Sequence, residues 1–496
     1  MAIQNITGSL AVALRHHQAG RLSQAESIYR QILHAQPNQP DALHLLGVIA
    51  HQCGKHDVAV EYIRQALRHQ PGAAEFHNHL GEAYRAQGKL EEAGAHYQEA
   101  LRLKPDYAEA YNSLGVVLGQ QGRLEEAIAR YRQALAHKPA FAEACHNLGN
   151  ALKKQGRSEE AGEQYRQALA IRPAYAEAHN NLGIILMEQG RLEEAKTHYS
   201  QALTLKPTYA EPHNNLGNVR REQGRFEEAI EHYRRAVIHK PDFAMAYNNL
   251  GVALQEQGRL QEAEASYRRA LARQPDYAKA LNNLGTVLKD QGRPEEAVAY
   301  YRQALARKPD LAEAHSNLLL TMLYSPSNTA DAIAVAHRNW NDQHARPLTS
   351  RIKHHENDPD PERRLRVGYV SADFFSHSVS YFVEPLLAAH DRANVEVVCY
   401  STGVRADVVT SRLQALSDVW QNIAGLSDEA VVERIAADRV DILVDLSGHT
   451  ARNRLLVFAR KPAPVQVSYL GYEPTTGLAT MDYKLTDQFL CPADTP

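Results

Sequence analysis

The 496-residue sequence predicts two folds in one chain, an all-α solenoid of repeated helix pairs followed by an α/β lobe with a parallel sheet. Two interlocked series point to the solenoid, because prolines and glycines each return every 34 residues. After Arg364, short β-branched runs alternate with helical segments, a pattern typical of a parallel sheet. Single cores rarely grow beyond about 250 to 300 residues, so at least two units are expected.

Composition excludes several classes of partner. The formal net charge of −3 does not indicate the excess of basic residues that nucleic-acid binding requires. No apolar run reaches the roughly 18 residues of a membrane helix. The four cysteines lie far apart, without metal-ligand spacing: Cys53, Cys145, Cys399 and Cys491. We therefore expect reduced thiols, no metal site and a cytoplasmic location.

One complete repeat runs from Ala210 to Phe243, and its apolar positions recur at three- and four-residue steps on both sides of Gly224. This pattern predicts two amphipathic helices joined by a tight turn. Pro241 should end the second helix, since its ring and missing N–H prevent continuation. Gly217 and Ala229 are expected where the helices approach closely. The proline series that sets the register is 37, 71, 105, 139, 173, 207, 241, 275 and 309.

These features match the tetratricopeptide pattern, with nine units between Ile6 and Leu311 and a half-unit from Ala312. Each unit buries its apolar face only against its neighbours, which predicts a right-handed solenoid with a concave groove. Such a groove typically binds protein. The alternative is a rigid spacer.

A row of asparagines recurs two residues before the Leu-Gly glycine of the later repeats. Amides in the groove could hold the backbone of an extended acceptor peptide, because each offers a donor and an acceptor. Alternatively, they hydrogen-bond between adjacent repeats. The row comprises Asn147, Asn181, Asn215, Asn249, Asn283 and Asn317.

Three domains are predicted: the repeat array at 1–324, a helix and polar linker at 325–363, and the lobe at 364–496. In the lobe, four runs read as strands, "LRVGYVS", "VEVVCYS", "VDILVDL" and "VQVSYLG". Helices are expected at Tyr381–His390 and Asp428–Arg439. Ligands of such sheets bind beyond the carboxyl ends of the strands.

Polar loops follow three of these strands, "SADFFSHSVSYF", "DLSGHTARNR" and "YLGYEPTTG". His377 in the first loop is the candidate catalytic residue, and Asp373 is read as a cap or turn residue. In the second loop, Gly448 would let backbone approach a ligand, and His449 and Thr450 supply polar groups. Asp445 is expected to orient its neighbours. No GxGxxG fingerprint is present, which disfavours a dinucleotide enzyme.

Together with the repeats, the segments "RLRVGYVSADFFSHSVSYFVEPLL", "DILVDLSGHTARNRL" and "KPAPVQVSYLGYEPTTGLATMDYKLTD" resemble the protein O-GlcNAc transferases, most closely their SPINDLY-like branch. The resemblance covers almost the whole chain. It implies the first Rossmann-like lobe of a two-lobed GT-B glycosyltransferase, with repeats that deliver the acceptor protein.

The resemblance implies transfer of one sugar from a nucleotide sugar to Ser or Thr hydroxyls of intracellular proteins, with inversion and without metal or cofactor. His377 corresponds to the active-site histidine, as general base or as a contact to donor and acceptor. An imidazole with a pKa near ~6.5 suits a base. His449, Thr450, Asp445 and Gly448 correspond to the loop that shapes the sugar pocket.

Two departures from the family pattern stand out. Glu473 replaces the proline that usually follows the tyrosine, and the chain stops at "LTDQFLCPADTP", where the family passes to its second lobe. We therefore expect the chain as given not to turn over donor. UDP-GlcNAc is the expected donor. The alternatives are GDP-fucose, or a non-catalytic scaffold, and a homodimer is left open.

Overall fold

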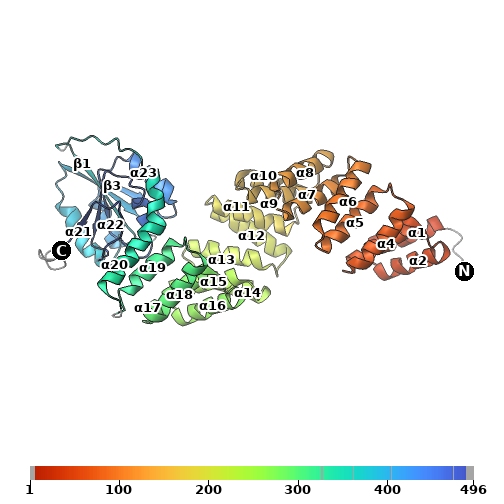
Figure 1. Ribbon diagram of the computed structural model, residues 1–496, viewed down its shortest axis with the longest axis horizontal. Coiled ribbons are helices and arrows are strands. Elements are labelled where there is room, and N and C mark those ends of the chain that lie inside the picture. The colour runs from red at the N-terminus through yellow and green to blue at the C-terminus, as the bar shows by residue number, and fades with distance from the viewer. Residues whose placement is uncertain (1–5, 326–327, 361, 404, 473, 487–496) are drawn as a thin grey trace. The chain divides into compact units, whose positions relative to one another are not determined.

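The computed structural model describes residues 6–325, 328–360, 362–403, 405–472 and 474–486. The chain folds as two compact units, Met1–His239 and Lys240–Pro496 (Figure 1). Helix pairs fill the first unit. The second unit joins further repeats to the α/β lobe, so the predicted limit of the array at residue 324 lies inside it.

The first unit consists of helices that pair in chain order, two for each repeat. Their bounds are α1 Ile6–Gln18, α2 Leu22–Ala35, α3 Pro40–Gln52, α4 His56–His69, α5 Ala74–Ala86, α6 Leu90–Leu103, α7 Ala108–Gln120, α8 Leu124–His137, α9 Ala142–Lys154, α10 Ser158–Ile171, α11 Ala176–Glu188, α12 Leu192–Leu205, α13 Ala210–Glu222 and α14 Phe226–His239.

The second unit begins with the remaining repeat helices. Their bounds are α15 Ala244–Glu256, α16 Leu260–Arg273, α17 Ala278–Asp290, α18 Pro294–Arg307 and α19 Ala312–Met322. Helices α1 to α18 form the nine pairs that the proline and glycine series predict, and α19 is the terminal half-unit. After it come α20 Ala330–Trp340 and the short helical turns Asn341–Ala345 and Arg346–Arg351.

The repeat from α13 to α14 shows why the pattern folds this way. The turn residue Gly224 has a φ of 71°, in the left-handed region that glycine enters at little cost. A Cβ built on Gly217 would lie 2.5 Å from Tyr233 Cε1, so only glycine lets that buried ring pack across the helix pair. Helix α14 ends at His239, two residues before Pro241, as predicted.

The lobe is a parallel sheet in the order β3-β2-β1-β4-β5-β6. The strands are β1 Leu365–Ser371, β2 Val395–Ser401, β3 Val419–Asn422, β4 Ile442–Asp445, β5 Val465–Tyr469 and β6 Tyr483–Leu485, and the helices are α21 Ser378–Ala389, α22 Val408–Ala415, α23 Asp428–Ala437 and α24 Leu455–Phe458.

The four predicted strands and the two predicted helices are present; β1 and β2 have the predicted bounds, and the other four elements differ from the prediction at one or both ends. Four short elements were not predicted, namely β3, β6, α22 and α24. Strand β3 reads "VWQN" and β6 reads "YKL", and both lie at sheet edges where side chains stay half-buried or exposed. Without a buried face, neither shows the apolar pattern by which strands are recognised.

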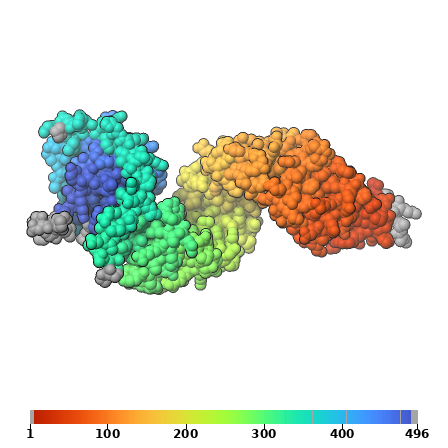
Figure 2. Space-filling view, in the orientation of Figure 1, coloured from red at the N-terminus to blue at the C-terminus, as the bar shows by residue number. Residues whose placement is uncertain are grey.

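Helices α19 and α20 are part of the core of the lobe. Leu319 and Trp340 pack in one buried cluster with Val370, Tyr400 and Phe458. Figure 2 shows this segment, in teal, packed against the blue surface of the lobe. The last repeat and the lobe therefore share a hydrophobic core.

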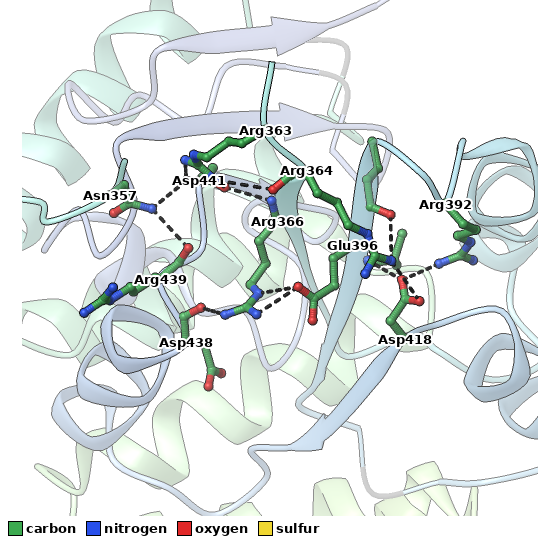
Figure 3. A network of polar contacts seen from close by, with 12 residues as sticks. Asn357, Arg363, Arg364, Arg366, Arg392, Glu396, Asp418, Asp438, Arg439 and Asp441 are labelled. Atoms are coloured by element: carbon green, nitrogen blue, oxygen red, sulfur yellow. Dashed lines mark hydrogen bonds and ion pairs between the residues drawn. The ribbon is translucent and has the colours of Figure 1, made fainter. Parts of the chain in front are cut away.

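The polar linker is fixed to the amino-terminal edge of the sheet (Figure 3). The buried Asp441 carboxylate accepts hydrogen bonds from Asn357 Nδ2 at 2.6 Å, Arg363 Nη1 at 2.8 Å and the Arg366 N–H at 2.8 Å. These bonds lower the pKa of Asp441. The Arg366 guanidinium pairs with Glu396 on the neighbouring strand. This network lies at the edge opposite to the loops described next.

Two further expectations concern the state of the cysteines and the presence of a membrane span. Cys53, Cys145 and Cys399 are free thiols, and burial raises the pKa of Cys399 to about 12. Cys491 lies outside the described residues. In the described ranges, none of the helices combines the length and apolarity that crossing a membrane demands.

Candidate functional site

The candidate site lies at the carboxyl edge of the sheet. All strand pairs are parallel, so the loops after β1, β2, β4 and β5 leave from the same edge. Strands β1 and β4 are direct neighbours. The topology thus brings the loop of His377 next to the loop that contains Gly448 and Thr450.

His377 is the N-cap of helix α21. Its Nδ1 accepts a hydrogen bond from the Val379 N–H at 3.3 Å, and its carbonyl accepts from the Ser380 hydroxyl at 2.7 Å. Asp373 was expected as a cap or turn residue, and of the two residues the histidine is the cap. The imidazole is 39% exposed, and Asp373 Oδ2 lies 4.0 Å from Nδ1. An accessible imidazole at a strand end could exchange a proton with a bound hydroxyl.

Asp445 ends strand β4 and orients the following loop, as expected. Its buried carboxylate accepts hydrogen bonds from the N–H groups of Ser447 at 3.1 Å and Gly448 at 2.9 Å. Burial raises the pKa of Asp445 to about 6. Gly448 has a φ of 54°, and a Cβ there would overlap Tyr472. The glycine thus allows backbone to approach a protein side chain, where approach to a ligand was expected.

His449 has a different position from the one expected of a sugar contact. It is fully buried, with Nδ1 3.0 Å from Ser316 Oγ and Nε2 2.9 Å from the Thr476 carbonyl. Since a carbonyl only accepts, Nε2 carries the proton, and Nδ1 accepts from the serine hydroxyl. Burial lowers the pKa of His449 to about 3, so the ring is neutral. Both nitrogens are occupied by protein groups, and the residue connects the loop to α19.

A second buried histidine extends this contact between the lobe loops and the helices α19 and α20, which we call the joint. His337 Nδ1 donates to the Ile333 carbonyl at 2.7 Å, and its Nε2 accepts from the Tyr472 hydroxyl at 2.8 Å. Trp340 packs against His449 with ring centroids 4.9 Å apart. Neither His337 nor Tyr472 was predicted from the sequence to have a role. The signal for His337 was a histidine in a helix outside the 34-residue register, and the signal for Tyr472 was its place in the polar loop after β5.

A cavity of about 390 Å³ lies where the last repeats meet the second loop. Asn283 and Asn317 line it from the repeats, and Thr450 lines it from the lobe. The Thr450 hydroxyl donates to the Ser447 carbonyl at 2.8 Å. The other residues that line the cavity include Glu256, Asp290, Glu313, Arg405, Arg452 and Asn453. Glu256 and Arg452 form an ion pair at 3.7 Å across it.

The asparagine row links adjacent repeats. Asn215 Nδ2 donates to Asn180 at 3.0 Å, and Asn283 Nδ2 donates to Asn248 at 3.0 Å. The same kind of bond to the preceding repeat is made by Asn147, Asn181 and Asn317. The row members are half-buried, whereas Asn180 and Asn248 are buried. This geometry agrees with the inter-repeat interpretation, and peptide binding stays a prediction.

Two features remain, the possibility of a metal site and the third polar loop. Among the described residues, no group of three or more His, Cys, Asp or Glu side chains could hold a metal ion. The expectation of a cofactor-free reaction stays a prediction. Glu473, the departure in the third loop, lies outside the described residues.

Repeats that end at the loop edge of a parallel α/β lobe define a class of two-part proteins, in which a tetratricopeptide array is joined to a Rossmann-like domain. Residues 302–495 match the model of glycosyl transferase family 41. They belong to that family, in the group of the O-GlcNAc transferases and SPINDLY proteins. Residues 242–310 and 217–258 match tetratricopeptide models, and 2–215 match the C-terminal domain of a cilia and flagella-associated protein.

Curated relatives are named as peptide N-acetylglucosaminyltransferases. A probable UDP-N-acetylglucosamine–peptide N-acetylglucosaminyltransferase SPINDLY of Petunia hybrida is 45% identical over 181 residues, 36% of this chain and 19% of the relative. The Caenorhabditis elegans UDP-N-acetylglucosamine–peptide N-acetylglucosaminyltransferase is 38% identical over 132 residues, 26% of this chain and 12% of the relative. The chain thus aligns with about a fifth or less of the length of these relatives.

A solved structure shares the fold. A mutant of the Thermobaculum terrenum O-GlcNAc transferase is 39% identical, with a TM-score of 0.54, over 57% of this chain and 54% of that one. The predicted combination of a repeat solenoid and a Rossmann-like lobe is therefore confirmed.

Proposed function

We propose that this chain supplies the acceptor-binding array and the first catalytic lobe of a protein O-GlcNAc transferase. The reaction moves N-acetylglucosamine from UDP-GlcNAc to Ser or Thr hydroxyls of proteins. The observation that carries this proposal is the cavity that Asn283 and Asn317 line together with Thr450 of the family 41 domain. An acceptor segment held by the last repeats would reach the loop edge of the sheet there.

His377 is the residue proposed to act on the acceptor. Its exposed imidazole would take the hydroxyl proton as the acceptor oxygen attacks the anomeric carbon, and the sugar–diphosphate bond would break with inversion. Thr450 and the backbone at Gly448 belong to the loop proposed to shape the sugar site. Asp445 and His449 serve this loop from within the protein, by holding its backbone.

The donor proposal draws on the relatives, whose names specify UDP-N-acetylglucosamine. None of these names supports the GDP-fucose alternative. Binding of acceptor proteins in the groove, a cytoplasmic location and a homodimer remain proposals. A non-catalytic scaffold is the competing function, since the repeats alone could bind protein.

The test uses the native protein that carries this sequence, captured from its source cells, with its own bound proteins as acceptors. We expect UDP-GlcNAc to label Ser or Thr residues, and His377→Ala to abolish labelling while acceptor binding persists. His354→Ala, at an exposed position of the polar linker, is the control and should keep full activity.

Three results would contradict the proposal in different ways. Labelling from GDP-fucose alone would make the protein a fucosyltransferase. Acceptor binding without labelling from either donor would make it a scaffold. Equal labelling by the His377→Ala variant would remove this histidine from the mechanism.

A further inference from the structure

Asp373 and His377 lie four residues apart in the loop after strand β1. The Ser376 N–H donates to Asp407 at 2.8 Å, and the Thr410 hydroxyl donates to the Phe374 carbonyl at 2.8 Å. The loop is thereby fastened to the start of α22. With the backbone held at these two points, closing the 4.0 Å between Asp373 Oδ2 and His377 Nδ1 to a hydrogen bond requires a side-chain rotation.

The Asp373 carboxylate has an unusual setting. Its side chain is 19% exposed, and in the described part of the chain no hydrogen bond reaches its oxygens. Burial raises the pKa of Asp373, and His377 and Arg452 oppose this shift. A half-buried carboxylate without a hydrogen-bond donor costs folding stability, so its presence beside an accessible imidazole calls for a functional reason.

The hydrogen bond to the helix presents a chemical problem for a base. While Nδ1 accepts from the Val379 N–H, the neutral ring carries its proton on Nε2. In that tautomer Nε2 has no lone pair for the acceptor proton. A base at Nε2 needs the proton on Nδ1, and Nδ1–H then needs an acceptor. Asp373 is placed to be that acceptor.

We propose that Asp373 is a positioning residue for His377, whose carboxylate accepts the Nδ1 proton and leaves the Nε2 lone pair for the acceptor hydroxyl. The catalytic part rests on the proposed function. In the reaction, the hydroxyl proton passes to Nε2, the acceptor oxygen bonds to the anomeric carbon, and the diphosphate leaves with the electron pair. The carboxylate then offsets the positive charge of the imidazolium, which lies at the positive end of α21.

The first test needs no activity. Ring-nitrogen NMR of the 496-residue chain with isotope-labelled histidine reports which nitrogen carries the proton, and His377→Gln identifies the signal. We expect a mixture of tautomers in the wild type and only Nε2–H in Asp373→Ala, with Asp373→Asn between them. Glu384→Gln removes one charge from α21 while leaving the loop intact, and should match the wild type. Identical tautomer ratios in wild type and Asp373→Ala would overturn the inference.

A stability measurement separates positioning from a structural role. Because the ionised carboxylate is held against its desolvation cost, Asp373→Asn should leave the thermal midpoint unchanged or raised. A fall in the midpoint, with the tautomer unchanged, would make Asp373 a structural residue.

The second test measures transfer by the native protein. Asp373→Ala should lower kcat about 100-fold, with the KM for acceptor unchanged, because the base and not the binding surface is affected. If the wild type transfers no sugar, the proposed function fails, and the NMR result still decides the role of Asp373. If wild type and Asp373→Ala transfer equally, only this inference fails.

Discussion

Ser316 Oγ lies 3.0 Å from His449 Nδ1, and this buried hydrogen bond joins the last repeat helix to the loop after strand β4. Ser316 directly precedes Asn317, and His449 directly precedes Thr450. Both of these neighbours line the cavity. This pair of polar side chains thus helps to hold the end of the array and the candidate sugar loop in register.

Removing the serine hydroxyl should weaken this joint. Ser316→Ala leaves His449 Nδ1 buried without a donor, which costs about 1–3 kcal/mol. We expect faster amide hydrogen exchange in residues 446–453 and a lower thermal midpoint. Ser411→Ala, on the exposed face of α22, is the control and should change neither. Unchanged exchange in the Ser316 variant would show that other contacts hold the loop.

The buried histidines of this joint should make the second unit sensitive to acid. Burial lowers the pKa of His449 to about 3, and it lowers the pKa of His315, the buried residue before Ser316 on α19, to about 4, from 6.5. Between pH 6.5 and these values the unfolded chain takes up protons that the folded chain refuses. Stability is therefore full above pH 6.5 and falls with acidification, by up to ~1.4 kcal/mol per pH unit for each group.

Denaturant midpoints measured across this range check the effect. Asp445 acts in the opposite direction, since its raised pKa costs stability as pH rises from 3.8 to about 6. His449→Gln should lower stability near neutral pH and flatten the acid dependence. An equally steep dependence in that variant would assign the effect to other groups.

The repeats should not tolerate a side chain where the tyrosine ring crosses. Gly217→Ala places a Cβ 2.5 Å from Tyr233 Cε1, and such overpacking costs about 1–3 kcal/mol. Gly94→Ala is the matched control, because its nearest neighbour would be Val117 Cγ1 at 3.9 Å. It should stabilise helix α6 by up to ~1 kcal/mol. Thermal melts of the two variants should therefore shift in opposite directions.

The two interpretations of the asparagine row predict different results. If the amides hold acceptor backbone, replacing Asn249, Asn283 and Asn317 with Ala should weaken binding of protein acceptors far more than binding of short peptides at the loop edge. Fluorescence anisotropy with both kinds of ligand measures this. If the amides only connect repeats, the thermal midpoint falls while the folded variant binds both ligands as the wild type does.

The sequence alone determined the repeats and the main strands. The Gly217, Gly224 and Pro241 positions each follow from local sterics, which repeat every 34 residues, so the nine helix pairs can be counted from the sequence. The buried strands β1, β2, β4 and β5 show in the sequence because both their faces are apolar. The edge strands β3 and β6 do not, since their neighbours, and not their own residues, decide that they pair.

Tertiary structure alone decided what the candidate site residues touch. His377 and His449 look alike as loop histidines after strands, yet one is 39% exposed and the other fully buried. The difference arises because α19 and α20 cover the β4 loop, a contact between segments 133 residues apart that no local pattern encodes. Burial and hydrogen-bond partners depend on such long-range packing, and with them the protonation state of each ring.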